Sequence, residues 1–400
     1  MISALWFIPL IVFILLLSDI FFKGNRWKSI FLFFILFLVW GGNELNGADW
    51  LNYSKEYERL TDIRSIFEVG ALGQFEWLFS ILLWMFSSLK IPYLGFVAFI
   101  GLINTSCLMW VMGKLKIENR GQVLAMLFLI EGWTLYHEQL RQAVAVSLCM
   151  VAFVQFINKK KLAAFFIVFI ATGFHSSAIF SLAIFYLIRV IEKRDGKPIS
   201  IKESIYASLI LIFGIFVILE FVKYGVFSHL GLIRLQEKFA IYQSDEVYGS
   251  SLFTAGIVAY PIGLFILLQY RKLAINNANI WYSLAWSGAI LWCFLGPCLR
   301  MIAILIRFEH YLLIFFPFVI GIYSFSFKGK KEYKFSWLLI FLFSCTFMVR
   351  IAISPEHQIW INNYQNTFLG YLFGLPEDDM NKRQEIICNH LSEVGNNFCE

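Results

Sequence analysis

The sequence predicts an all-α polytopic membrane protein with about 12 transmembrane helices. Two observations support this prediction. Hydrophobic residues make up 59% of the 400-residue chain and charged residues only 15%, a composition well outside the range of soluble globular proteins. The apolar residues also recur in runs of roughly 20, the length that a helix needs to cross about 30 Å of hydrocarbon. Helices are expected because a helical segment satisfies its backbone hydrogen bonds internally, without water.

One spanning helix is assigned to each long apolar run, and residues 1–352 are expected to form a single transmembrane domain. The expected helices cover residues 3–22, 29–45, 93–112, 122–136, 141–157, 162–174, 177–191, 204–222, 251–270, 280–297, 308–327 and 335–352. The first run has no basic residue before it, so we expect a retained helix rather than a cleaved signal peptide. Residues 353–400 are expected to form an external polar tail.

The basic residues indicate which side of the membrane each loop faces. More than half of the 33 Lys and Arg residues lie in six short gaps, at residues 23–28, 113–120, 158–161, 189–202, 271–279 and 328–334. Basic residues in short loops favour the cytoplasm, which places both termini on the external, periplasmic side. The net charge of +6 is thereby explained as a topology signal, and no nucleic-acid partner is expected.

Residues 46–90 are expected to form one long external loop, and residues 223–250 a second. Within the first loop, the apolar run Phe75–Leu89 would extend only about 22 Å as a helix. We therefore expect it to dock in the outer leaflet without crossing, although a tilted complete span remains an alternative. The polar stretch from Asn46 to Gly70 would then face the cell exterior.

The seven cysteines show no spacing typical of a metal site, and most lie in or beside apolar runs, where cysteine usually packs as a small hydrophobic residue. No acidic pair or Cys/His cluster calls for a metal or another cofactor, so none is expected. Cys388 and Cys399 lie in the polar tail and could form a disulfide if the tail is outside the cytosol.

Several ionisable residues lie at the expected outer ends of spanning helices. An arginine near a helix centre costs about 2.5–3.5 kcal/mol to insert in a membrane, so those that persist are usually functional. The residues in question are Arg141, His175, Arg300, Arg307, Glu309 and His310. Because they gather on one membrane face, we expect a functional site there. The arginines could instead be interface anchors, His175 a helix-break residue, and Glu309 a partner that neutralises a neighbouring arginine.

A second group of polar residues lies in the first external loop. Asp49, Tyr53, Glu56 and Tyr57 have spacings that place them on one face of a helix, although Asp49 could be only a helix cap. Carboxylates accept hydrogen bonds from sugar hydroxyls and aromatic rings stack on sugar faces. Arginines at the membrane boundary suit a pyrophosphate, because the guanidinium pairs with phosphate oxygens through two parallel bonds.

An ordered set of motifs resembles the EpsG/Wzy family of bacterial polysaccharide polymerases. The matching stretches are GADWLNYSKEY from Gly47, FEWLF from Phe75, LRQAVA from Leu140, FHSSAI from Phe174 and IRFEHY from Ile306. The resemblance covers roughly residues 30–325, and the tail after Ser354 lies beyond it. The family pattern has glycine and an aromatic residue after the glutamate, whereas this chain has Trp77 and Leu78.

The resemblance implies a metal-independent glycosyltransferase of the bacterial inner membrane, similar in layout to multi-span GT-C-like enzymes. Its donor and acceptor would be oligosaccharides linked to undecaprenyl pyrophosphate. The implied residues are Asp49 as general base, with His175 as the alternative; Arg141, Arg307 and, as a weaker candidate, Arg300 for the pyrophosphate; and Tyr53, Tyr57, Glu76, Gln142, Glu309, His310 and Tyr311 to bind sugar or orient these groups. Glu309 and His310 are expected to orient Arg307 or the acceptor.

Two other classes of protein remain as alternatives. A transporter of lipid-linked oligosaccharides would also use basic residues, but in a cavity that opens to the cytoplasm. A membrane-bound acyltransferase would centre on a buried histidine, for which His175 is the candidate. The sequence leaves open the sugar composition, the linkage formed, the destination of the product, the oligomeric state and whether a chain-length regulator binds.

Overall fold

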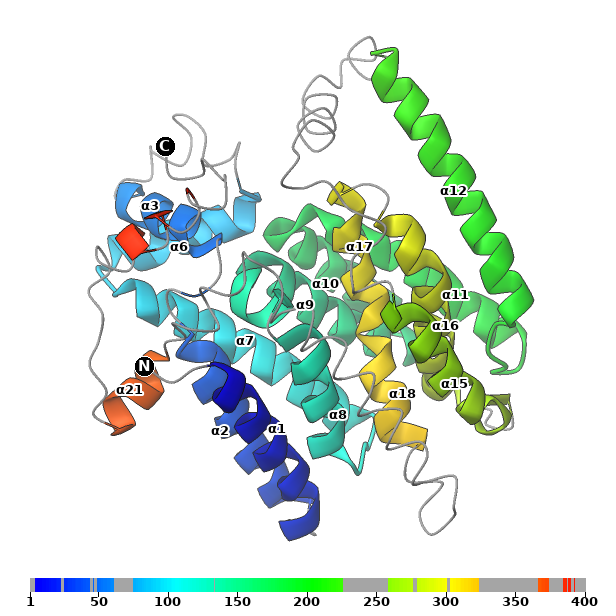
Figure 1. Ribbon diagram of the computed structural model, residues 1–400, viewed down its shortest axis with the longest axis horizontal. Coiled ribbons are helices and arrows are strands. Elements are labelled where there is room, and N and C mark those ends of the chain that lie inside the picture. Colours follow the sequence, from blue (N-terminus) through cyan, green and yellow to red (C-terminus); the bar gives the residue numbers. More distant parts are fainter. Residues whose placement is uncertain are drawn as a thin grey trace. The chain divides into compact units, whose positions relative to one another are not determined.

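The structure is a computed structural model (Figure 1). It describes residues 4–22, 25–43, 46, 49–60, 75–132, 134–225, 258–275, 279–300, 303–323 and 366–373, with residues 384–386, 388–389 and 392. Over these residues every regular element is a helix, in agreement with the predicted all-α class. The chain divides into two compact units, which are described separately. Unit 1 contains residues 1–185 and 348–400, and unit 2 contains residues 186–347.

Unit 1 is a helical bundle with a small layer of two helices at one end. Its elements are α1 (Ala4–Phe21), α2 (Asn25–Gly41), α3 (Asp49–Arg59), α6 (Trp77–Ser88), α7 (Tyr93–Lys114), α8 (Arg120–Leu127), η1 (Phe128–Gly132), η2 (Thr134–Glu138), α9 (Leu140–Ile157), α10 (Lys161–Phe174), η3 (Ser176–Phe180), the start of α11 (Ser181–Lys193), and α21 (Thr367–Phe373). Helix α9 packs against α7 and α10, and α3 packs against α6 (Figure 1).

Unit 2 is built around α16 (Ile280–Leu299). The remaining elements are the rest of α11, α12 (Ile201–Lys223), α15 (Ala259–Ile275), α17 (Ala303–Leu313) and α18 (Phe315–Tyr323). Helix α16 contacts α12, α15, α17 and α18. The contact with α15 is close: a Cβ at Gly296 would lie 2.2 Å from the ring of Tyr260, so only glycine permits this approach.

Four described helices are long and apolar enough to cross a membrane: Tyr93–Lys114, Leu140–Ile157, Ile201–Lys223 and Ile280–Leu299. They support the membrane assignment, while the count of about 12 stays a prediction. Two expected spans are interrupted. Residues 122–136 run from α8 into the π-helical segments η1 and η2, and residues 308–327 include the break between α17 and α18. The expected span 335–352 and nearly all of the expected loop 223–250 lie outside the described residues.

The long helices differ in how much of their surface the protein covers. In α9 and α16, 72% of the residues in the apolar window are buried, whereas in α12 only 17% are. Large apolar side chains of α12, such as Ile210 and Phe213, are exposed, as expected for a helix that faces lipid. Arg141 is the second residue of α9 and Arg300 directly follows α16. Two of the predicted arginines are therefore placed at the ends of interior helices.

Helix α6 occupies the run that was expected to dock in the outer leaflet. It has 12 residues, or about 18 Å of helix, against about 30 Å of hydrocarbon. Phe79, Leu83 and Phe86 are buried in the unit, while Trp77 and Ile81 on other sides of the helix are exposed. The helix is therefore shorter than a straight complete span needs, and its docking in the outer leaflet stays a prediction.

Part of the expected external tail packs onto the bundle. Helix α21 contacts α2, and the ring centroids of Phe368 and Phe37 lie 5.7 Å apart. Further along the tail, Cys388 is disulfide-bonded, while its expected partner Cys399 lies outside the described residues. A disulfide is typical of a segment outside the cytosol.

Candidate functional site

The centre of the candidate site in unit 1 is Arg141, at the beginning of α9. Its Nη1 lies 2.7 Å from Oε2 of Glu76, and its Nε donates to Oη of Tyr53 at 3.3 Å. The site therefore joins α9 to α3 and to the start of α6, three elements that are distant in sequence. This arrangement brings together three of the residues that the sequence analysis selected.

Aromatic rings surround the guanidinium of Arg141. Its Cζ lies 4.7 Å from the ring centroid of Phe75, 5.5 Å from that of Tyr53 and 5.8 Å from that of Phe79. Rings at these distances attract a cation and exclude water from it. The Arg141 side chain remains 13% exposed, and the recorded bonds use Nε and Nη1 only. The Nη2 donors have no recorded partner among the described residues, so the fork can still bind an anion.

Glu76 connects the arginine to the segment that carries His175. It occupies the N-terminal cap of α6, and its Oε1 accepts a hydrogen bond from the backbone N–H of Ser176 at 2.9 Å. Burial by itself would raise the pKa of Glu76, but the positive charge of Arg141 and the hydrogen bonds outweigh it, so the pKa lies below its ordinary value. Glu76 is therefore an ionised carboxylate at neutral pH, fixed between two elements.

Tyr53 carries the network on to Asp49. Its hydroxyl donates to Oδ2 of Asp49 at 2.9 Å, and the two residues are one helical turn apart on α3. Burial and the charge of Asp49 raise the pKa of Tyr53, so the phenol stays protonated and keeps its donor. Asp49 is the first residue of α3, where the helix dipole favours a negative charge, and it is only half-buried.

His175 lies in a break between two helices, as the sequence predicted. It ends α10 and precedes η3 with an extended backbone, φ −154° and ψ 123°. Its Nδ1 accepts a hydrogen bond from the backbone N–H of Ser177 at 3.2 Å and lies 2.6 Å from the Ser177 hydroxyl oxygen. Since Nδ1 accepts from an amide, the proton of the neutral ring is on Nε2. In this state His175 offers a donor, not a base, from Nε2.

Two further predicted residues of unit 1 are buried around the site. The Tyr57 hydroxyl donates to the backbone carbonyl of Ile91, and its ring packs edge-on against Tyr93 at 5.5 Å. These contacts attach α3 to the beginning of α7. Gln142 follows Arg141 and is almost fully buried. Both side chains face the packed interior, which leaves their predicted sugar contacts without support from the geometry.

A second charged cluster lies in unit 2, around Glu309. This carboxylate is nearly inaccessible and accepts from the Tyr260 hydroxyl at 2.8 Å and from the Trp292 indole N–H at 2.9 Å. Arg300 donates to it through Nε at 2.9 Å and Nη2 at 3.3 Å. The guanidinium also lies over the Tyr260 ring, 5.6 Å from its centroid. Glu309 thus joins α15, α16 and α17.

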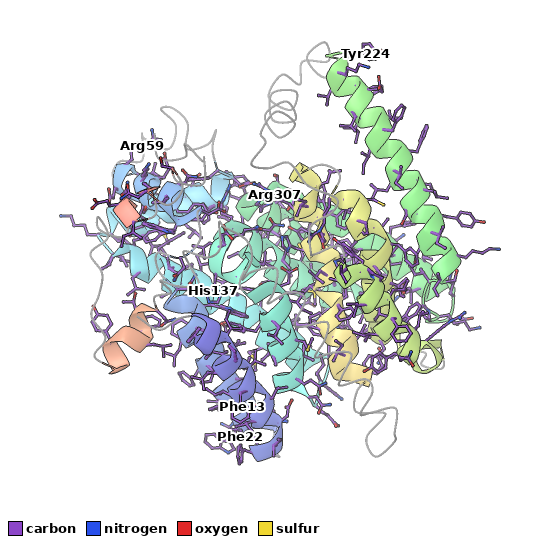
Figure 2. The ribbon with its side chains drawn as sticks, viewed as in Figure 1. Phe13, Phe22, Arg59, His137, Tyr224 and Arg307 are labelled. Carbon is purple, nitrogen blue, oxygen red and sulfur yellow. The ribbon has the colours of Figure 1, made fainter. Side chains whose placement is uncertain are left out.

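The pairing of Glu309 with Arg300 fits the alternative in which Glu309 neutralises a neighbouring arginine, and its expected role in orienting Arg307 or the acceptor stays a prediction. Residues two positions apart lie on opposite sides of a helix, and Glu309 faces α15 and α16. Arg307 is half-buried on α17 (Figure 2), His310 is mostly buried and Tyr311 is fully buried. Arg307 belongs to unit 2 whereas Arg141 and His175 belong to unit 1, so a chamber shared by all three stays a prediction.

Several side chains that build these clusters were not predicted from the sequence. Phe75 and Phe79 lie on either side of Glu76 in the FEWLF motif. An arginine that pairs with Glu76 could have suggested that these rings would contact its guanidinium. Tyr260 and Trp292 had no such signal, because nothing in their neighbourhood is polar. A missed intramembrane carboxylate, Glu131, is fully buried in η1. The sequence did contain a signal for Glu131, because an acidic residue within an apolar run is rare unless it has a role.

Among the described residues, no group of three or more His, Cys, Asp and Glu side chains could hold a metal ion. The charged clusters instead pair arginines with single carboxylates. In unit 1 the arginine lies beside an ionised carboxylate and aromatic rings, whereas in unit 2 the carboxylate is buried between its donors.

Comparison with known proteins gives one match. No curated protein and no solved structure matches the chain. The model of the EpsG family matches residues 26–366, which extends at both ends beyond the resemblance expected over residues 30–325 and includes the start of the tail. This match covers most of the chain and contains every residue of the two clusters. The chain therefore belongs to the EpsG family.

Proposed function

We propose that this protein is a polysaccharide repeat-unit polymerase. It transfers a glycan from one undecaprenyl pyrophosphate carrier to the terminal sugar hydroxyl of another lipid-linked repeat unit, at the periplasmic face of the inner membrane. Membership of the EpsG family supports a role of this kind. The observation that carries the proposal is the guanidinium of Arg141, which lies among three aromatic rings beside the ionised Glu76 and has further donors at Nη2 that pair with no described residue.

In the proposed reaction, the acceptor hydroxyl attacks the anomeric carbon of the donor glycan. The bond from that carbon to the pyrophosphate oxygen breaks, and its electron pair leaves with the diphosphate. Arg141 stabilises the charge that develops on the leaving group, because a preorganised donor in a water-poor site is most effective there. Glu76 and the three rings hold the guanidinium in place.

Asp49 is the proposed base that takes the proton of the acceptor hydroxyl. It is half-buried and so is within reach of a substrate, whereas His175 is almost fully buried. The Nδ1 of His175 already accepts from Ser177, so the proposal keeps Asp49 as the base. Tyr53 links the base to the arginine.

In unit 2, the proposal assigns the second pyrophosphate contact to Arg307. Arg300 already donates Nε and Nη2 to the buried Glu309, and the proposal treats this ion pair as structural. Arg300 and Glu309 would then support the end of α16 and the position of α17. Arg307 is half-buried on α17, and a guanidinium can pair with phosphate oxygens through two parallel bonds.

The proposal is tested with purified protein in lipid nanodiscs supplied with lipid-linked repeat units. The polymerase is expected to yield a ladder of products, with Arg141→Ala reducing turnover on the order of 10²–10³-fold. Arg141→Lys should rescue poorly, because an ammonium lacks the planar fork. Lys160→Ala, an exposed cation at the other end of α9, is the matched control. Translocation without polymer would indicate a transporter, and a normal ladder from Arg141→Ala would refute the assignment.

A further inference from the structure

The carboxyl end of α2 is capped by a side chain from the tail, more than 300 positions away. The Nδ2 of Asn366 donates to the backbone carbonyls of Leu38 at 2.9 Å and Val39 at 3.1 Å. Both belong to the last four carbonyls of α2, where the regular helical donors run out, and the Leu38 carbonyl also accepts from the N–H of Gly42 at 3.3 Å. Asn366 is buried, and its Oδ1 accepts from the N–H of Leu369, the beginning of α21.

The contact continues through the backbone that leaves α2. The N–H of Thr367 donates to the carbonyl of Gly42 at 3.0 Å. A Cβ at Gly42 would lie 2.5 Å from Oδ1 of Asn366 and 2.8 Å from the carbonyl of Leu38. Only glycine therefore leaves room for the tail at this point. We call the contacts of Asn366 and Thr367 with residues 38–42 the tail clamp.

The residues after the tail clamp connect it to the candidate site. Asn43 donates through Nδ2 to the carbonyl of His137 at 2.7 Å, and Asn46 donates to Oδ1 of Asn43 at 2.8 Å. All three residues are buried, and Figure 2 shows His137 beside the end of α2. His137 lies four residues before Arg141, and Asn46 three residues before Asp49. The tail clamp thus fixes the end of α2, and the hydrogen bonds that follow it connect the chain before Asp49 with the chain before Arg141.

Resting on the proposed function, we propose that Asn366 is a positioning residue for the polymerase site. By fixing the last turn of α2 it sets where the chain enters α3, and so places Asp49 and Tyr53 against Arg141. The contacts of Asn366 that carry this role are those with Leu38, Val39 and Leu369. Small displacements of reacting groups have large kinetic effects, because about 1 Å of misplacement can lower a rate about 100-fold.

The first test is Asn366→Asp in the full chain, in nanodiscs. This change keeps the size and Oδ1 but removes the two donated bonds and places a negative charge at a helix carboxyl end. Hydrogen exchange of the amides in residues 42–60 is expected to accelerate about five- to tenfold, while residues 140–157 remain unchanged. In Gly42→Ala, the added Cβ would displace Oδ1 of Asn366. This variant should give the same pattern of exchange. Asn158→Asp, at the exposed end of α9, should give no change.

The second test separates positioning from simple support of the fold. With lipid-linked repeat units, Asn366→Asp should lower kcat about tenfold and leave KM within about twofold, because the lost bonds misplace the base without touching bound lipid. Combined with Tyr53→Phe, the loss should be smaller than the product of the two single effects, since both act on one geometry.

Each outcome decides a different claim. Unchanged exchange in residues 42–60 overturns the tail clamp itself. Faster exchange with unchanged kcat overturns the positioning role and leaves the proposed function intact. A normal ladder from Arg141→Ala overturns the proposed function, and with it any catalytic purpose of the tail clamp, whatever the exchange data show.

Discussion

Glu76 and Arg141 are 65 positions apart in the sequence, and Oε2 of the first lies 2.7 Å from Nη1 of the second. Both side chains are mostly buried, 18% and 13% exposed. A carboxylate at the start of α6 thus fixes a guanidinium at the start of α9. Because both groups are mostly buried, leaving either charge unpaired would be costly. The same carboxylate also holds the segment next to His175.

The first prediction concerns this pair. Glu76→Gln should destabilise unit 1 by about 2–4 kcal/mol, because it leaves a mostly buried guanidinium without its counter-charge. Arg141→Gln should have an effect of similar size. In a double-mutant cycle the two losses should be clearly non-additive. Thermal unfolding followed by size-exclusion chromatography measures this, with Glu56→Gln, whose partner Arg59 is exposed, as the control. Additive losses would show that the two charges do not interact.

The second prediction is a dependence of stability on pH. The folded-state pKa of Glu76 lies below its ordinary value of 4.5, so the unfolded state binds its proton first as the pH falls. The stabilisation from Glu76 is therefore fully present above about pH 5 and is lost as the pH drops through the folded pKa. A wild-type melting temperature that falls below pH 4.5 more steeply than that of Glu76→Gln would support this sign. Parallel curves for the two proteins would contradict it.

The third prediction concerns Tyr53. Tyr53→Phe keeps the ring beside Arg141 but removes the hydrogen bonds to Asp49 and Arg141. We expect a loss of about 1–2 kcal/mol in stability and a fall in kcat of about 10- to 100-fold, because both the base and the guanidinium lose a fixed partner. Polymer formation in nanodiscs gives the rate. Tyr186→Phe, on an exposed part of α11, should behave like the wild type, and equal activity of the two variants would rule out a role for the phenol.

The fourth prediction concerns Glu309 in unit 2. Glu309→Ala leaves Arg300, Tyr260 and Trp292 without their shared acceptor, so unit 2 should lose about 3–5 kcal/mol. The yield of monodisperse protein and its melting temperature should both fall. Glu220→Ala on α12, a partly exposed acid, is the comparison. A melting temperature unchanged by Glu309→Ala would show that the cluster is not structural.

The fifth prediction concerns topology. Lys55 on α3 and Lys160 before α10 are both exposed, and the positive-inside rule places them on opposite sides of the membrane. Lys55→Cys should react with a membrane-impermeant maleimide in intact spheroplasts, whereas Lys160→Cys should react only after permeabilisation. The reverse pattern would place Asp49 in the cytoplasm and remove the basis of a periplasmic polymerase.

The local sequence was enough to predict most helices, because apolar runs of spanning length have few alternatives to a helix. The start of α9 at Leu140 and the break at His175 both agree with the expected spans. The segment before Arg141 was expected to be one helix and is π-helical instead. No local pattern distinguishes a π-helical turn, since its wider hydrogen bonding depends on the packing around it.

The sequence by itself determined the membrane class, the approximate positions of most described helices and the residue types of the site, because hydropathy and charge act locally along the chain. Only the tertiary structure decided the pairings: Glu76 with Arg141, Glu309 with Arg300, and Asn366 with the end of α2. The physical reason is that a buried charge or carbonyl needs a partner within about 3 Å, and packing brings that partner from a distant part of the chain.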